Sequence, residues 1–302
     1  MSQFEPRPKT IFLKLVLGCF VFLDIFILVF IWGSERRKGL EVIFFDVGQG
    51  DSIFIETKDK FQVLIDGGPD LVVLEKLAKE MPFYDRTIDL IILTHPDHDH
   101  IFGLLEVLKR YRIENILWTG VIKDSAEWRE WKKLIENEGA ELLIAEAGQK
   151  IILEGFDSSK EQGPYILVLH PFENLEGRKF KYYNDTSVVA KLVFRDISFL
   201  FTGDISKKIE KKLIEKTEER TEGISSSVLK VAHHGSKFSS SEEFLESVAP
   251  EIAIISVGEN NYSQPDSGVL ANLEKFDIKA LITKEEGDIK VFSDGKNFQI
   301  KY

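Results

Sequence analysis

Cysteine is nearly absent from this sequence of 302 residues, which has a single cysteine, Cys19. One cysteine cannot build a disulfide framework within the chain. Because Cys19 lies in the first apolar stretch, the remaining sequence offers no cysteine nucleophile or zinc ligand. Positive charge is not in excess either, since the net charge is -11. This balance argues against a broadly basic nucleic-acid surface, although it leaves room for a local cationic groove.

The sequence also lacks internal repeats of fixed period and low-complexity tracts. Its charged fraction of 29% and apolar fraction of 43% are ordinary for a globular protein. The length allows one large domain or two smaller ones, with ample apolar core.

A long apolar run is present near the N-terminus, from Ile11 to Trp32. Its 22 residues are long enough to cross a hydrocarbon core of ~30 Å as a helix. Lys14 can extend toward the membrane interface, whereas Asp24 is unusual at mid-span. A cleaved signal peptide is the alternative, but the run is long for one and is followed by SERRKG instead of a small-residue cleavage site. We therefore expect an uncleaved transmembrane helix.

The apolar run divides the chain into three expected parts. Residues 1–33 would hold a cytoplasmic stub and the membrane anchor, residues 34–39 a charged linker, and residues 40–302 the globular domain. Basic residues flank both ends of the run, so charge alone decides the orientation poorly.

Strand and helix patterns alternate through the globular part. Residues 52–57 with 61–66, and 288–294 with 297–302, are predicted hairpins. Between them lie strand–helix units, including a strongly charged predicted helix at 205–220 with a solvated face. Hairpins at both ends and strand–helix units between them predict two mixed sheets, each covered by helices.

The segment THPDHDH, Thr94 to His100, is the strongest chemical signal in the chain. It follows a short β-branched run, Ile88 to Leu93, and precedes a predicted helix, Ile101 to Arg112. Burying so much imidazole and carboxylate without a cation would be costly. These donor types suit zinc, or manganese where carboxylates are many. We therefore predict metal binding, and the four candidate ligands are His95, Asp97, Asp99 and His100.

Three further polar positions follow apolar strands later in the chain: His170, Asp204 and the pair His233–His234. Each alone would be weak, because a histidine after a strand is more often a surface or satisfied core residue. Together with the first segment they supply enough donors for two ions.

A plausible division gives one ion His95, Asp97 and His170. The other ion would take Asp99, His100 and one of His233 or His234, with Asp204 bridging the two. A pair of ions ~3.5–4 Å apart can hold a hydroxide and stabilise attacking and leaving oxygens. Asp66, in the sequence DGG, can orient a ligand imidazole, although a simple turn aspartate fits its spacing equally well.

These motifs resemble the metallo-β-lactamase superfamily, and more closely the hydrolase domain of ComEC-type bacterial competence proteins. The match is carried in order by FFDVGQGDSIFIE, LIDGG, LTHPDHDH with Gly103, LHP, NDTSVVAKL, FLFTGD, VLKVAHHGS and ISVG. The resemblance implies an αββα sandwich with its site at one edge between the sheets. It also implies that His95, Asp97, Asp99, His100, Asp204 and the His233–His234 pair form the metal region, with His170 carried over. Aspartate at position 97, where the superfamily usually has histidine, fits the ComEC-type pattern.

Two residues depart from that pattern. His98 stands where relatives often have a small residue, and it could be an outer or substrate-side group or inert. Gln264, before Pro265, stands where relatives often have histidine. Glutamine can donate a hydrogen bond but cannot act as an acid. The single candidate span also means that this chain could not by itself form the membrane channel of such competence proteins.

The leading functional hypothesis is a membrane-anchored hydrolase with two divalent ions, Zn²⁺ favoured and Mn²⁺ the alternative, in which Asp99 is the catalytic residue. The resemblance makes a phosphodiester the expected substrate, in particular short or single-stranded nucleic acid. A cell-surface polymer or lipid headgroup is the close alternative. We expect a single-pass protein of the cell membrane with an extracytoplasmic site. A catalytically weak metal-binding accessory domain is the second hypothesis, and a β-lactamase or thioesterase ranks third, since a fold does not settle chemistry.

Overall fold

The computed structural model describes residues 12, 16–25, 39–153, 163–217 and 223–302. The chain divides into two units, Met1–Lys38 and Gly39–Tyr302. In the first unit, residues 16–25 are helical, and the rest of the predicted span from Ile11 to Trp32, apart from Phe12, lies outside the described residues. Among the described residues, none of the helices combines the length and the apolar character needed to cross a membrane.

The unit from Gly39 to Tyr302 is built on two sheets. The first sheet has eight strands, and the four strands at one end of it, β3 to β6, run parallel. In spatial order its strands are β15 (Phe298–Lys301), β14 (Ile289–Ser293), β1 (Leu40–Phe44), β2 (Ile53–Glu56), β3 (Gln62–Ile65), β4 (Thr87–Ile92), β5 (Arg112–Trp118) and β6 (Glu141–Ile144). The expected hairpins are present, because β2 pairs antiparallel with β3 and β14 with β15.

The second sheet has seven strands, of which β10 to β13 run parallel. In spatial order they are β13 (Lys279–Ile282), β12 (Ile252–Ile255), β11 (Val228–Lys230), β10 (Ile197–Phe201), β9 (Val189–Phe194), β8 (Tyr165–His170) and β7 (Lys150–Ile152).

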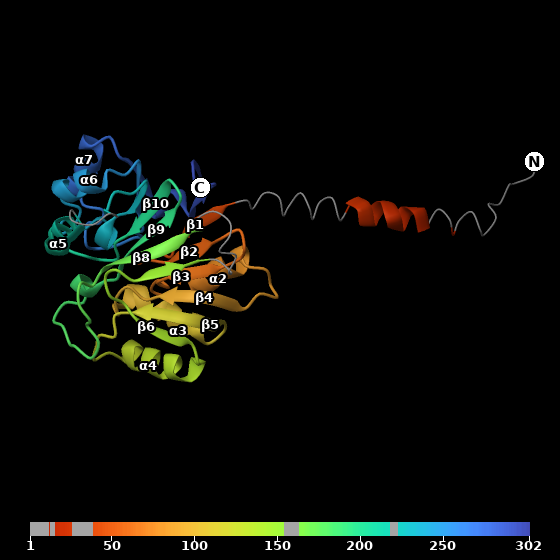
Figure 1. Cartoon of the computed structure of the whole chain (residues 1–302), viewed down its shortest axis with the longest axis horizontal. Coiled ribbons are helices and arrows are strands. Elements are labelled where there is room, and N and C mark those ends of the chain that lie inside the picture. Colours follow the sequence, from red (N-terminus) through yellow and green to blue (C-terminus); the bar gives the residue numbers. More distant parts are fainter. Residues whose placement is uncertain (1–11, 13–15, 26–38, 154–162, 218–222) are drawn as a thin grey trace, which may run out of the picture. The chain divides into compact units, whose positions relative to one another are not determined.

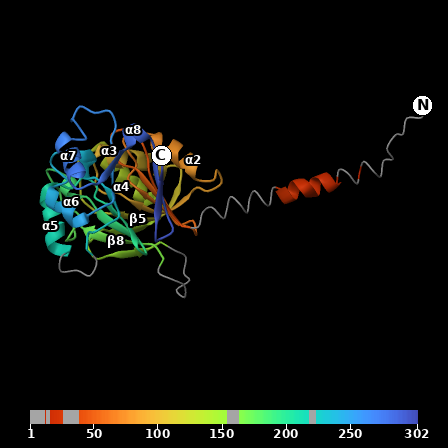
Figure 2. The same ribbon diagram turned by 90° about the horizontal axis from the view of Figure 1, so that it is seen from above.

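Helices cover the outer face of each sheet (Figure 1). The first sheet carries α2 (Val72–Glu80), α3 (His98–Leu108) and α4 (Ala126–Glu138). The second carries α5 (Lys207–Thr217), α6 (Glu242–Val248) and α7 (Ser267–Lys275). The view from above separates α2 in orange from the group α5, α6 and α7 on the other side of the domain (Figure 2). A short helix, α8 (Thr283–Glu286), and two 3₁₀ turns, η1 (Asn184–Thr186) and η2 (Ala232–Gly235), complete the elements.

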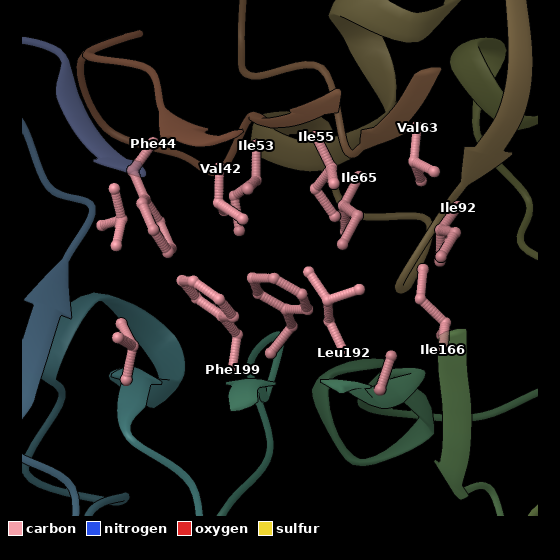
Figure 3. Close-up of a cluster of buried hydrophobic side chains, with 14 of the residues drawn as sticks. Val42, Phe44, Ile53, Ile55, Val63, Ile65, Ile92, Ile166, Leu192 and Phe199 are labelled. Atoms are coloured by element: carbon pink, nitrogen blue, oxygen red, sulfur yellow. The ribbon is translucent and has the colours of Figure 1, made fainter. Parts of the chain in front are cut away.

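Side-chain alternation along the strands produces the layers. Val42 and Phe44 of β1 point into the core between the sheets, where Leu192 and Phe199 meet them from the second sheet (Figure 3). Ile43, between them in sequence, packs instead with the helices of the first sheet. Strands buried on both faces need apolar residues at nearly every position, which explains their uninterrupted apolar runs. The predicted αββα sandwich is therefore confirmed.

One element boundary differs from the expectation in a way that matters for the site. The predicted helix at Ile101 to Arg112 begins earlier, at His98, and ends at Leu108, while Arg112 opens β5. Asp97 takes the N-cap position in extended conformation. The last three of the seven residues of THPDHDH therefore lie on the first helical turn, where neighbouring residues point in different directions.

Candidate metal centre

The segment from His95 to His100 leaves the end of β4 and turns into α3 at one edge of the sandwich. His95 and His100 are buried to 1% and 0% exposure. His98 points elsewhere: its side chain is 57% exposed, and its Nδ1 lies 3.5 Å from Glu127 Oε1. The structure therefore separates His98 from the other histidines of the segment and places it beside α4.

The second sheet supplies Asp204 after β10 and the histidine pair after β11. His233 and His234 form the turn η2 with φ of 51° and 54°, a left-handed conformation that is uncommon for residues other than glycine. Hydrogen bonds maintain this turn, since His233 N donates to Gly203 O at 3.1 Å and Ser236 N donates to His233 O at 2.9 Å. Such a backbone persists where the surroundings determine it, and it is frequent at functional sites.

Asp204 is the centre of the cluster. Its Oδ2 lies 3.5 Å from the Nε2 atoms of both His100 and His234, 3.8 Å from that of His233 and 3.9 Å from that of His95. The bridging role that the sequence analysis gave to Asp204 stays a prediction, and this central position is compatible with it. Asp97 and Asp99 flank the cluster, because Asp97 Oδ2 lies 3.7 Å from His95 Nε2 and Asp99 Oδ2 lies 3.3 Å from His234 Nε2.

The outer nitrogens of the rings fix their orientation. His100 Nδ1 contacts Asp66 Oδ2 at 2.8 Å, and His234 Nδ1 contacts Ser256 O at 2.8 Å. Asp66 is itself held by Thr94, whose N and Oγ1 donate to its two oxygens at 2.8 and 2.6 Å. Contacts of this kind on the outer nitrogen direct Nε2 inward, as partners of metal-ligating histidines do.

His170 lies apart from the arrangement that the sequence predicted. Its Nδ1 contacts Ser187 O at 2.8 Å, and its ring packs edge-on against Phe172. In the described part of the chain it belongs to none of the four groups whose donor atoms lie within 4.8 Å of one another. The structure thus does not bring His170 to the first ion, and His233 and Asn184 lie beside Asp204 instead. A histidine at the end of a strand is satisfied here by a backbone carbonyl.

Five buried polar atoms of the cluster have no hydrogen-bond partner. They are Nε2 of His95, His100 and His234 and Oδ1 of Asp51 and Asp204. Leaving one such atom unsatisfied costs about 1–3 kcal/mol, so five together would be a heavy penalty for an empty site. Imidazole nitrogens and carboxylate oxygens that converge in this way fit divalent metal ions.

Two charged residues of the site escaped the sequence analysis, Asp51 and Lys230. Both are buried, at 2% and 1% exposure, and they form an ion pair. Lys230 Nζ also lies 3.4 Å from Gly203 O and 4.0 Å from Asp204 Oδ1, while Asp51 Oδ1 lies 3.5 Å from His234 Nδ1. A signal was present in the sequence, because a lysine interrupting the apolar run VLKVA needs a buried partner.

The mutual electrostatics of the cluster shift several pKa values. Burial opposes ionisation of Asp204 and Asp99, but the neighbouring imidazoles outweigh it and hold both pKa values below their ordinary range. Burial likewise disfavours the charged form of His100 and His234, yet Asp204 and the other carboxylates raise the pKa of both. Burial dominates at His95 and His233, where the pKa is lowered. Metal ions would therefore compete with protons for His100 and His234.

A cleft of about 580 Å³ opens beside the cluster and exposes it to ligands. Asp97, Asp99, Asp204 and the histidine pair form part of its wall. Gln264 also lines it: its Oε1 accepts from Gln49 Nε2 at 2.8 Å, and its Nε2 donates to His233 O at 3.1 Å. The predicted substrate-side position of Gln264 is thus at the cleft, where it braces the histidine turn.

Comparison with known proteins places these features in a family. The metallo-β-lactamase superfamily model matches residues 45–259, so the chain belongs to this superfamily and has the metal-dependent hydrolase fold. Among curated relatives, the chain is 29% identical over 281 residues to ComE operon protein 3 of Bacillus subtilis, covering 87% of this chain and 34% of that protein. It is 29% identical over 256 residues to competence protein ComA of Neisseria gonorrhoeae, covering 82% and 32%. The chain thus spans about a third of the length of these relatives, and the resemblance to ComEC-type proteins is confirmed.

Solved structures share the fold at low sequence identity. The metallo-β-lactamase fold protein YhfI of Bacillus subtilis superposes with a TM-score of 0.55 at 13% identity, covering 84% of this chain and all of that one. CmlA, a diiron β-hydroxylase from Streptomyces venezuelae, superposes with a TM-score of 0.54 at 11% identity, covering 84% and 54%.

The first prediction concerns the ligands. In the full chain loaded with zinc, we expect His95→Ala to lose bound metal and His98→Ala to keep it, because only His95 joins the cluster. His170→Asn, which can still donate to Ser187 O, should also keep its metal. Metal content after dialysis is the measurement. Loss of an ion from the His170 variant would restore the ligand division expected from the sequence.

The second prediction concerns the buried ion pair. Lys230→Met leaves Asp51 buried without its cation and should lower the free energy of unfolding by about 3–5 kcal/mol. Adding Asp51→Asn should recover more than half of that loss, because the two charges disappear together. Urea unfolding in EDTA measures both. Lys275→Met is the control: its pair with Glu242 is exposed, so the expected change is under about 1 kcal/mol. Additive costs in the double variant would contradict the pairing.

Proposed function

We propose that this protein hydrolyses phosphodiesters with two divalent metal ions, and that short or single-stranded nucleic acid is its leading substrate. The observation that carries the proposal is the convergence of five buried polar atoms without a hydrogen-bond partner, one of them on Asp204, at the wall of an open cleft. The likeness to competence proteins supports the choice of nucleic acid. When bound, a pair of ions would activate a water and stabilise charge on the phosphoryl oxygens.

Side chains of the cleft have roles that their positions support. Asp99 is 30% exposed at the cleft wall, and its low pKa keeps it an ionised acceptor for a hydrogen bond from the attacking water. Asn184 Nδ2, within 3.4 Å of both Asp204 Oδ2 and His233 Nε2, can donate to a phosphoryl oxygen. Lys237 adds positive charge to the same wall, which favours an anionic substrate.

The test is hydrolysis of bis(p-nitrophenyl) phosphate by the full chain with Zn²⁺ or Mn²⁺. We expect Asp99→Ala and Asp204→Ala to lower kcat/KM by about 100-fold or more, and EDTA to abolish release of nitrophenol. His98→Ala serves as the matched control from the same segment. Bound metal without cleavage of this or any other phosphodiester would defeat the proposal.

One observation favours a second candidate, a catalytically weak metal-binding accessory domain. Both ends of the Gln264 amide are engaged within the protein, by Gln49 and by His233. The residue in the place of the histidine of relatives therefore acts as a brace. Under this second candidate the protein would bind metal and ligand but fail to turn over in the same assay.

We also propose that residues 11–32 anchor the chain in the cell membrane as a single span, with the site on the extracytoplasmic side. The apolar composition of the run supports this proposal. The full chain expressed in bacteria should float with membranes and resist extraction with alkaline carbonate. Protease added to intact spheroplasts should degrade the globular part. Recovery in the supernatant after carbonate treatment would rule out the anchor, and protection in spheroplasts would reverse the orientation.

A further inference from the structure

Two large aromatic side chains on the cleft wall are exposed to solvent. Phe238 is 63% exposed and Tyr262 is 77% exposed, and both line the cleft that contains Asp99 and Asp204. Single exposed aromatic residues are common on protein surfaces. Two exposed aromatic rings at the edge of the cleft that contains the candidate metal ligands suggest a binding role, because their faces offer planar contact area to a ligand.

The backbone that carries Phe238 is held in place. Phe238 O accepts from Lys207 N at 2.9 Å, and Phe238 N donates to Ser236 Oγ at the longer distance of 3.4 Å. Ser239 Oγ lies 2.9 Å from Ala232 O and 2.9 Å from Ser236 O, so its hydroxyl can donate to either carbonyl. This loop continues directly from the turn of His233 and His234. The backbone therefore holds Phe238 at a defined place relative to the candidate ligands, although its ring is mostly exposed.

Hydrogen bonds from one side chain, that of Asn260, hold the loop of Tyr262. The side chain of Asn260 accepts from Tyr262 N at 2.9 Å and Gln264 N at 3.1 Å, and donates to Gly258 O at 3.0 Å and Gln264 O at 2.8 Å. Gln264 in turn donates to His233 O. Both aromatic loops are thus tied to the same histidine turn, and neither ring needs ordering of its backbone before it meets a ligand. Such preorganisation lowers the cost of binding.

The remaining groups of the wall indicate what kind of ligand would use these rings. Lys237 lies beside Phe238, with Nζ 5.3 Å from the ring centroid, and brings a cation to the wall of an otherwise acidic cleft. The ligand should have an anionic group that can meet the bound ions and Lys237. It should also have planar groups that can stack on the two aromatic rings. A single-stranded nucleic acid has both, whereas a duplex hides its base faces by stacking and a glycerol-type headgroup has none.

We propose that Phe238 and Tyr262 form a stacking subsite for unpaired bases next to the scissile phosphate, which makes the site selective for single strands. This inference rests on the proposed function and adds to it the residues that determine specificity. Stacking of a base on an aromatic side chain changes affinity by roughly 5- to 150-fold per ring, and it tolerates any base sequence.

The experiment compares two labelled single strands of equal length and equal phosphate number, one with bases and one with abasic residues throughout. Fluorescence anisotropy with the zinc-loaded full chain gives the affinity for each, and the ratio is the readout. We expect the normal strand to bind at least about tenfold more tightly. Phe238→Ala and Tyr262→Ala should each reduce that ratio about fivefold or more, while Phe238→Trp should keep it. Phe83→Ala, which removes a ring that is 86% exposed and does not line the cleft, should leave the ratio unchanged.

The outcomes separate this inference from the proposed function. A ratio near one, an unchanged ratio in both alanine variants, or equal affinity for a duplex of the same sequence would overturn the stacking subsite, even if bis(p-nitrophenyl) phosphate is cleaved. A high ratio that both alanine variants reduce would support the subsite even if no phosphodiester is hydrolysed. In that case the subsite belongs to a binding domain and only the hydrolase proposal fails.

Discussion

The concentration of negative charge around Asp204 is the constraint on which the rest of this structure depends. Five carboxylates lie in or directly against the site, and two lysines, Lys123 and Lys230, contact three of them. The five are Asp51, Asp66, Asp97, Asp99 and Asp204. With neutral imidazoles, this leaves an excess of three negative charges, largely buried, which a protein interior does not tolerate without cations. One divalent ion would leave the site negative, whereas two would leave it weakly positive. A site that becomes weakly positive when filled suits an anionic ligand.

The charged and imidazole side chains of the site come from both halves of the sandwich, that is, from loops that follow strands of each sheet. His95 and His100 follow a strand of the first sheet, and Asp204 and His234 follow strands of the second. Protein groups already connect the two halves: Ser187 Oγ lies 3.3 Å from His95 Nδ1 and accepts from Asp204 N at 3.1 Å, and Asp51 Oδ1 lies 3.5 Å from His234 Nδ1. Cations bound by the four side chains would add to these contacts. Metal binding would therefore couple the edges of the two sheets as well as serve chemistry. Part of the binding free energy of the ions would appear as stability of the fold.

How far the sequence could predict this site depends on the kind of signal that each residue carries. The segment THPDHDH was informative because its donors are dense and follow a buried strand, and Asp204 and His234 followed the same pattern. The same pattern was ambiguous at His170, since a histidine at the end of a strand can equally be satisfied by a carbonyl, and only the fold shows that Ser187 O is within reach. The partnership of Asp51 with Lys230 joins positions 179 residues apart, which periodicity cannot reveal. The layers of the fold were predictable because they depend on local patterns. A strand that is apolar at every position must be buried on both faces, whichever elements bury it.

The groups that would bind the metal ions and the groups that would contact a substrate belong to different parts of this molecule. The metal depends on the donor set, and here Asp97 replaces the imidazole usual in the superfamily, with Lys123 held 2.6 Å from its Oδ1. Carboxylate ligands are harder than imidazole ligands, so the share of carboxylates in the donor set is what bears on the choice between zinc and manganese. The fold leaves the reaction open, since a diiron β-hydroxylase shares it. What remains to select the ligand is the wall of the cleft, which is built from loops fixed by side-chain hydrogen bonds from Asn260 and Gln264. Those loops can change their exposed residues without moving the metal donors, because the bonds that fix them come from other side chains. The groups that would hold the ions are therefore separate from the groups that would select the ligand.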